Sequence, residues 1–442
     1  MTDTICAVST PRGKGAVSII RVSGDDAFEI CDKLFFGKKK LANAASHSVH
    51  FGRVGNEAGE AIDECLVSVF VAPTSFTGEN VCEIACHGGI LVTQKVLDAV
   101  IAAGARIAEP GEFTKRAFLM GKLTLTQAES IKDVIDAQTS AALEAATKRL
   151  WGALSKPIEE IRRSLVRLAA AIGAAADFPE ENAADFAHED IRAILQRARD
   201  GIEKLLCGAK RGAFLRNGAK VAIVGVPNTG KSSILNALVE QNRAIVTAQP
   251  GTTRDIVEES IEIDGVPVCL GDTAGIRAAD DAVEKIGVEM AREYIKNAAM
   301  CIFVTEAGRE LTEEENELLK EIGDKPVITV ANKTDLCGDE RENAVKASAL
   351  ERRGMEELKS AISKALGDSS QDVYIANERV RSSLNGAKEA ICRAQKTIEG
   401  EFPEDVAMVD IADAIELLGV SDGKSVSEEI VDTVFAEFCL GK

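Results

Sequence analysis

Aromatic side chains are scarce in this sequence, at 4% of 442 residues, and there are only four histidines. A stacking surface for single-stranded nucleic acid is therefore not expected. The 11 cysteines include no CxxC pair, which argues against a disulfide framework and indicates a reducing compartment. No apolar run approaches the roughly 20 residues that cross a bilayer, and the start MTDTICAVST lacks the layout of a secretion signal. We expect a cytoplasmic protein without membrane insertion.

Basic charge is also in deficit, because 52 Lys and Arg residues face 71 Asp and Glu residues, a net charge of −19. A protein that coats nucleic acid by bulk charge is excluded, and any such contact must use a local patch. The 45% hydrophobic and 28% charged composition is that of an ordinary globular protein. At about 150 residues per domain, the length predicts roughly three domains.

Four segments differ in hydrophobic periodicity. Residues 1–118 contain short β-rich runs and one helix near 91–103, which predicts an α+β domain. Residues 119–212 follow a helical pattern, interrupted near 177–185 by an acidic loop. In residues 213–377, the apolar runs KVAIVG, VPVCLGD, MCIFVT and PVITVAN alternate with amphipathic stretches, as in a doubly wound parallel sheet. Helical periodicity returns over 378–442, so the α/β segment is predicted to be inserted into one all-α helical domain.

The segment GVPNTGKS, residues 225–232, fits the pattern GxxxxGK[ST] between a strand-like and a helix-like run. Gly225 and Gly230 let the backbone wrap around phosphate oxygens, and the following helix adds its positive N-terminal dipole. Lys231 would span the outer phosphates, and Ser232 would ligate magnesium. The sequence therefore predicts a P-loop.

Two later motifs specify the nucleotide. DTAG, residues 272–275, places the Asp272 carboxylate near the magnesium and the Gly275 amide near the terminal phosphate. NKTD, residues 332–335, supplies the Asp335 carboxylate, which accepts from the two donors of guanine that adenine lacks. In SAL, residues 348–350, the Ala349 amide could reach the guanine oxygen. The expected nucleotide is GTP.

The hydrolysis motifs leave two alternatives for charge neutralisation. Ile276 stands directly after DTAG, where Ras-like GTPases carry a water-orienting glutamine. Thr252 and Thr253 belong to a candidate switch loop, and Asn228 could help to hold a monovalent cation in the role of an arginine finger. Arg254 is the rival for that role.

These motifs, together with TAQPGTTRD, FTGEN, CHGG, PGEFTKRAF, DFPEEN and the terminal CLGK, make the chain resemble the MnmE (TrmE) family of tRNA-modification GTPases. The resemblance runs end to end. It implies an α+β folate-binding N-terminal domain, an all-α helical domain and an inserted P-loop α/β G domain. It also implies a homodimer through the N-terminal domains and a flavin-bearing MnmG-type partner. Together they would install a 5-carboxymethylaminomethyl or aminomethyl group on the tRNA wobble uridine.

The resemblance also assigns residues. The implied GTP contacts are Asn228, Thr229, Gly230, Lys231, Ser232, Ser233, Thr247, Thr253, Asp272, Thr273, Ala274, Gly275, Asn332, Lys333, Asp335, Ser348 and Ala349. Potassium would be held by Asn228, Thr247, Gln249 and Thr252, and magnesium by Ser232 and Thr253. A 5-formyltetrahydrofolate or related folate would bind Arg21, Glu83, Lys122 and Lys442. The expected catalytic residues are Glu284, which would orient the attacking water, Lys231, which would contact the outer phosphates, and Cys439, which matches the functional cysteine of the family.

Several features depart from the family pattern or have a second interpretation. SAL replaces the usual SAK or SAR, and VTEAG replaces VDA after MCIF. Cys439 could be a free thiol on a frayed tail. Cys82, Cys86 and His87 have a metal-like spacing, but a strand with alternating buried cysteines is at least as natural. Two other functions stay open, a ribosome-assembly switch that binds rRNA and a folate-binding scaffold regulated by its G domain.

Overall fold

The structure is a computed structural model, and it describes residues 3–177, 188–241, 257–272, 292–338, 341, 343–367, 375, 377–400, 404–439 and 441. Its internal contacts divide the chain into two units. The first combines Met1–Lys132 with Ile415–Lys442, and the second is Asp133–Ala414. Among the described residues, no helix is both long and apolar enough to span a membrane.

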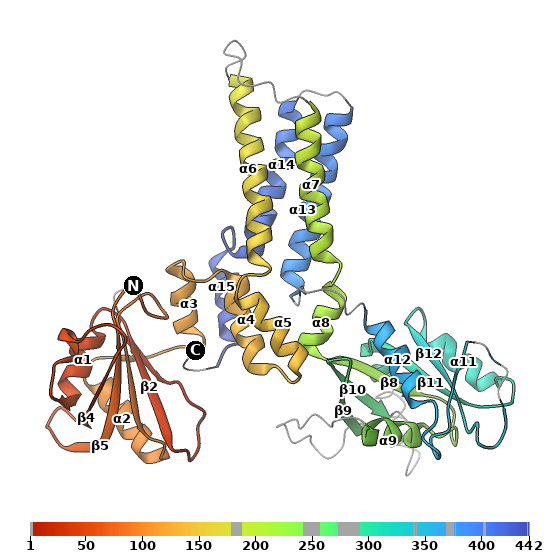
Figure 1. Ribbon diagram of the computed structural model, residues 1–442, viewed down its shortest axis with the longest axis horizontal. Coiled ribbons are helices and arrows are strands. Elements are labelled where there is room, and N and C mark those ends of the chain that lie inside the picture. Colours follow the sequence, from red (N-terminus) through yellow and green to blue (C-terminus); the bar gives the residue numbers. More distant parts are fainter. Residues whose placement is uncertain are drawn as a thin grey trace. The chain divides into compact units, whose positions relative to one another are not determined.

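The first unit contains a seven-stranded sheet in the order β3-β4-β5-β6-β2-β1-β7. The strands are β1 (Ile5–Val8), β2 (Val17–Ser23), β3 (Phe35–Gly37), β4 (Ser48–Gly55), β5 (Ala61–Phe70), β6 (Val81–His87) and β7 (Arg106–Ile107). Neighbours are antiparallel except for β1 and β7, which are parallel. Figure 1 shows helices α1 (Ala27–Leu34) and α2 (Ile90–Ala102) with this sheet.

Alternating side chains of these strands form the core of the sheet. Cys82, Ile84 and Cys86 point from β6 into one buried cluster with residues of α1 and α2. This confirms that the two cysteines belong to a half-buried strand. His87 lies outside that cluster and pairs with Asp63 at 2.8 Å.

The expectation of one helix in this region is wrong. Besides α2, the structure contains α1 and α3 (Glu112–Leu119), each of eight residues, and a 3₁₀ turn at Leu41–Asn43. A helix of about two turns places only a few apolar residues on its buried face, so periodicity detects it poorly. The sequence signal was sufficient only for the 13-residue α2.

The remainder of the first unit joins residues that are some 300 positions apart. Leu125 and Ala128, from the start of α4 (Leu125–Asp136), share a small core with Val431 and Phe435 of α15 (Glu428–Ala436). The Thr126 hydroxyl donates to the Ser421 carbonyl at 2.8 Å, near the end of α14 (Glu404–Asp422).

The second unit contains the helices α5 (Ser140–Leu150), α6 (Ser155–Asp177), α7 (His188–Leu206), α8 (Ala209–Asn217) and α13 (Glu378–Glu399). Helices α7 and α13 lie side by side (Figure 1), although the whole α/β segment separates them in the chain. Lys388 pairs with Glu203 at 3.2 Å, and the Gln395 amide donates to Gln196 at 3.1 Å. These contacts join the two helical segments, as expected for an inserted G domain.

The inserted segment forms a six-stranded sheet in the order β13-β12-β11-β8-β10-β9. Its strands are β8 (Ala219–Val224), β9 (Val257–Ile263), β10 (Val266–Asp272), β11 (Met300–Glu306), β12 (Val327–Asn332) and β13 (Val345–Lys346). Helices α9 (Lys231–Gln241), α11 (Glu313–Ile322) and α12 (Met355–Leu366) belong to the same segment.

The sequence predicts a parallel sheet, and this is confirmed for every strand except β9, which pairs antiparallel with β10. Asp264 and Gly265 both have positive φ in the two-residue turn between them. An Asp-Gly pair favours such a hairpin turn, so this signal was present in the sequence. The expected boundaries at 118, 212 and 377 stay predictions.

Candidate functional site

The P-loop lies between the end of β8 and the start of α9. Gly230 has φ 91°, and a Cβ there would lie 2.2 Å from the Asn332 amide nitrogen. A side chain at this position would therefore push the loop away from β12. The Thr229 hydroxyl donates to the Val226 carbonyl at 2.9 Å and closes the loop on itself.

Lys231 folds back over this loop. Its ammonium donates to the Gly225 and Val226 carbonyls at 2.8 and 2.9 Å, and only 6% of the residue is exposed. The positive charge is thus held at the N-terminus of α9, where backbone amides and the helix dipole attract anions.

Ser232 and Asp272 meet at the same edge of the sheet. The Ser232 hydroxyl donates to an oxygen of Asp272, the last residue of β10. Hydroxyl and carboxylate oxygens are ligands that Mg²⁺ prefers, so this pair fits a magnesium ion. Thr253, the second expected magnesium ligand, lies outside the described residues.

The base motif begins at the end of β12. The Asn332 amide donates to the Thr229 carbonyl at 2.8 Å, and its oxygen accepts from the Ala349 amide at 3.1 Å. One side chain therefore ties the P-loop to the SAL segment. Asp335 accepts a hydrogen bond from the Ser348 hydroxyl, which lowers the pKa of its carboxyl group. Asp335 is thus an ionised acceptor, as guanine recognition requires.

A second group of expected residues lies in the sheet of the first unit. Arg21 on β2 and Glu83 on β6 are direct partners in register, and their side chains form an ion pair at 2.7 Å. The Arg21 guanidinium also lies 5.4 Å from the ring centre of Phe76 and 5.6 Å from that of Phe113. A carboxylate, a cation and two rings suit a pterin, which offers paired N–H donors and a flat face.

The C-terminal tail joins this neighbourhood. The Cys439 carbonyl accepts from the Gly111 amide at 3.5 Å, two residues before Phe113. Gly441 packs on β1, because a Cβ there would lie 2.3 Å from the Val8 carbonyl oxygen. The backbone at Cys439 and Gly441 thus contacts the rest of the first unit, whereas the Cys439 thiol is free and exposed, and the role of this thiol stays a prediction.

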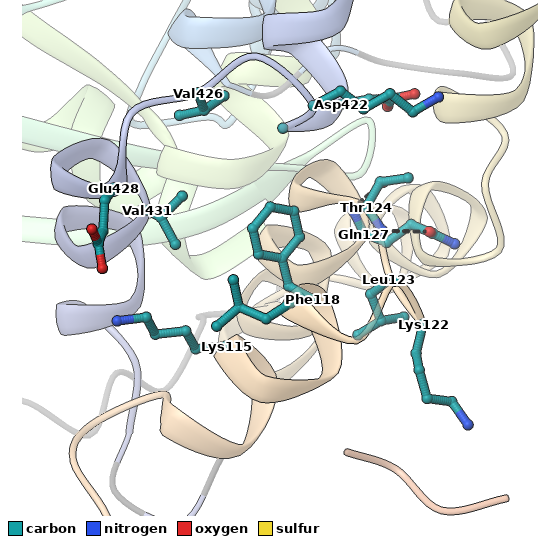
Figure 2. A pocket seen from close by; sticks show the side chains of 14 residues that line it. Lys115, Phe118, Lys122, Leu123, Thr124, Gln127, Asp422, Val426, Glu428 and Val431 are labelled. Carbon is teal, nitrogen blue, oxygen red and sulfur yellow. Dashed lines mark hydrogen bonds between the residues drawn. The ribbon is translucent and has the colours of Figure 1, made fainter. Parts of the chain in front are cut away.

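Lys122 lies beside the same neighbourhood, against the loop that contains FTGEN. Its ammonium donates to the Pro73 carbonyl at 2.7 Å, and its stem would lie 3.3 Å from a Cβ at Gly78. Lys122 also borders a cavity of about 610 Å³, with Phe118 and Val431 on its walls (Figure 2). In this view the Lys122 side chain extends away from Phe118. Arg21 and Glu83 do not line the cavity.

Known proteins match the chain along its whole length. The family model for the N-terminus of the GTP-binding protein TrmE matches residues 4–122, and the model for the MnmE helical domain matches residues 125–439. Proteins named tRNA modification GTPase MnmE are 41% identical in a Thermoanaerobacter species and 42% identical in Geobacillus thermodenitrificans. Each alignment covers 100% of this chain and 99% of the relative. The chain belongs to the MnmE family of tRNA-modification GTPases.

Among solved structures, Era of Aquifex aeolicus bound to GDP and AlF4⁻ is 26% identical, with a TM-score of 0.28. The match covers 39% of this chain and 66% of Era. At that score it adds nothing to the MnmE assignment.

Several expected site residues lie outside the described residues. They are Thr247, Gln249, Thr252, Thr253, Thr273, Ala274, Gly275, Glu284 and Lys442, together with Ile276 and Arg254. Ser233 is described and is exposed on α9. Asn228 is exposed in the P-loop with φ 65°.

Sequence reasoning missed three residues of this MnmE chain that the structure adds to its sites. Phe76 and Phe113 flank Arg21. They belong to the motifs FTGEN and PGEFTKRAF, but sequence reasoning assigned neither phenylalanine a role of its own. Arg116, which is 1% exposed, donates hydrogen bonds to Asp3 and Glu79. Because Arg116 belongs to PGEFTKRAF and Glu79 to FTGEN, the second bond holds these two motifs together. The available signal was a charged residue three positions after Phe113 and next to Ala117, on the helix face where apolar residues recur.

Proposed function

We propose that this chain hydrolyses GTP with stimulation by potassium and that the hydrolysis controls tRNA modification in the cytoplasm. With a flavin-containing MnmG-type partner, it forms the 5-carboxymethylaminomethyl or aminomethyl group on the wobble uridine. The observation that carries the GTP site is the meeting of Lys231, Ser232 and Asp272 with the Asn332 motif at the carboxyl edge of one sheet. Membership in the MnmE family supports tRNA as the substrate. It gives no support to the two alternative functions, a ribosome-assembly switch that binds rRNA and a folate-binding scaffold.

The phosphates of GTP bind at the N-terminus of α9. There Lys231 exchanges its two carbonyl partners for phosphate oxygens, which are stronger acceptors. Ser232 and Thr253 hold Mg²⁺, and Asp272 lies within hydrogen-bond reach of Ser232. When bound, the ion neutralises charge on the outer phosphates.

Potassium binds beside the P-loop at Asn228, Thr247, Gln249 and Thr252. Asn228 suits this role because it is exposed next to the phosphate site and its own backbone is held at φ 65°. Glu284 orients the attacking water, since the Ile276 side chain has no hydrogen-bonding group.

The test compares GTP hydrolysis in potassium and in sodium at equal ionic strength. We expect at least about tenfold stimulation by potassium, the scale of one charge-stabilising contact in the transition state. Asn228→Ala removes the stimulation, whereas Asn236→Ala, an exposed asparagine on α9, keeps it. Equal rates in both salts would refute the potassium mechanism and return Arg254 or an external activator to first place.

A folate binds between Arg21, Glu83, Lys122 and Lys442, where it supplies the one-carbon unit. Glu83, with Arg21 paired to it, lies at the pterin end, where its carboxylate accepts from the pterin N–H groups, and the lysines face the acidic end of the ligand. Cys439 belongs to the same neighbourhood through Gly111, which supports a role for its exposed thiol in the modification.

The functional assembly is a homodimer formed through the N-terminal domains, joined by the MnmG-type flavoprotein in a hetero-oligomer. An exposed apolar patch on the sheet of the first unit supports the dimer. It consists of Phe36, Val49, Phe51 and Leu66 on strands β3, β4 and β5. Exposed apolar patches of this kind mark interaction surfaces on soluble proteins.

A further inference from the structure

Glu306 lies directly beside the base-recognition motif. It is the last residue of β11 and stands opposite Asn332 in the parallel register of β11 and β12. Its carboxylate forms a hydrogen-bonded ion pair with the Lys333 ammonium. Strand β12 ends at Asn332, and Lys333, the next residue, has φ 67° and directs its side chain to Glu306.

A second cation holds the Glu306 carboxylate from the other side. Arg309 donates through Nε to Glu306 at 3.3 Å and through both terminal nitrogens to Glu315 at 2.7 and 2.8 Å. Glu315 is fully buried at the start of α11. Hydrogen bonding from Lys333, opposed by burial and assisted by Arg309, holds the pKa of Glu306 below its ordinary value. The carboxylate is therefore ionised and fixed to a rigid helix end.

We propose that Glu306 is a positioning residue for guanine-nucleotide binding. It holds the long Lys333 side chain in place before the nucleotide arrives, alongside Asp335. A free lysine side chain loses more rotamer freedom on immobilisation than most residues, and a preorganised one has already lost it. Removing the carboxylate therefore weakens nucleotide binding without altering the phosphate chemistry. This inference rests on the proposed guanine site.

The experiment measures the dissociation constant of a fluorescent GDP analogue for the full-length chain. Glu306→Gln is expected to raise the constant about tenfold, the scale of one charge-assisted hydrogen bond. Glu306→Asp, which restores the carboxylate, is expected to stay within about twofold of the parent. Glu321→Gln is the matched control, since its carboxylate pairs with Arg292 on the exposed side of α11.

Two further readouts separate positioning from a general structural role. Glu306→Gln should raise the KM for GTP while the rate at saturating GTP changes less than about twofold. In a Lys333→Met background, Glu306→Gln should have no further effect on binding, because its partner is gone. Thermal unfolding of Glu306→Gln and Glu321→Gln should coincide.

An unchanged dissociation constant in Glu306→Gln, or a loss that persists in the Lys333→Met background, would overturn the inference. Asp335→Asn tests the guanine site separately. If Asp335→Asn keeps the preference for guanine, the proposed base site itself is wrong. If it abolishes that preference while Glu306→Gln binds normally, only the role of Glu306 fails.

Discussion

At the scale of single residues, base selection depends on which atoms donate and which accept. Asp335 presents two acceptor oxygens, and the Ser348 hydroxyl occupies one side of the carboxylate, which fixes its orientation. The lowered pKa of Asp335 keeps both oxygens unprotonated at neutral pH. Guanine offers two N–H donors to such a pair, and adenine does not.

Replacing Asp335 by asparagine tests this polarity. The amide turns one acceptor into a donor, which opposes a guanine N–H and suits the carbonyl of xanthine. We expect kcat/KM for GTP to fall about 100-fold or more and hydrolysis of XTP to appear, since unpaired polar groups discriminate strongly. Rates with GTP and XTP check this, with Asp324→Asn on the exposed loop before β12 as the control. Retained preference for GTP would contradict the base assignment.

At the scale of elements, helix α11 is anchored by a capping box. The Thr312 hydroxyl accepts from the Glu315 amide, and the Glu315 carboxylate accepts from the Thr312 amide. Burial alone would raise the pKa of Glu315. The two bonds from Arg309 and the Thr312 amide outweigh burial and bring the pKa to about 2. The same carboxylate thus caps the helix and anchors the arginine that holds Glu306.

This element should lose stability in acid. The Glu315 carboxyl has a pKa of about 2 in the folded chain and an ordinary pKa of 4.5. Its ionised form therefore stabilises the fold fully above about pH 4.5, and this stabilisation is lost as the pH falls towards 2. The difference corresponds to about 3 kcal/mol. Hydrogen-exchange protection of the α11 amides from pH 6 to pH 3 should fall in the parent chain.

Two variants complete this test of α11. Glu315→Gln should be less protected at pH 6 and nearly independent of pH, because it has no proton to gain. Glu317→Gln, an exposed residue on the same helix, should behave like the parent. An equal pH response in Glu315→Gln and the parent would show that another group controls the acid sensitivity.

At the scale of the whole molecule, the sheet of the first unit leaves an apolar surface open. Phe51 and Leu66 are direct cross-strand partners on β4 and β5. Phe51 is 67% and Val49 60% exposed. The buried residues of β5, such as Val67 and Val69, point to the opposite face, towards the core cluster. A second copy of the chain would cover these side chains in the proposed homodimer.

Phe51→Glu should convert this dimer to a monomer. Placing a carboxylate in an apolar interface removes an aromatic contact and adds a desolvation cost, so the dimer dissociation constant should rise about 30-fold or more. Sedimentation equilibrium over a range of concentrations measures it. Leu91→Ser, which alters an equally exposed apolar residue on α2, should leave the constant unchanged. A monomeric parent chain would contradict the proposed interface.

Elements with strong local signals follow from the amino-acid order alone. GVPNTGKS is recognisable because its glycines, lysine and serine are closely spaced, and NKTD because its polar residues are consecutive. Both the P-loop and the guanine motif can therefore be identified from the sequence alone. Helical periodicity is expected from residue 378 onward, and helix α13 does begin at Glu378. The end-to-end motifs also suffice for the MnmE family.

Contacts between distant residues depend instead on how the elements pack. Arg21, Phe76, Phe113 and Cys439 gather because β2, a loop, α3 and the C-terminal tail pack together, and no local pattern encodes such contacts. The pairing of Glu306 with Lys333 likewise depends on the register of two strands joined through a helix. Local motifs follow from backbone geometry over a few residues, whereas these neighbourhoods follow from burial of apolar surface across the whole chain.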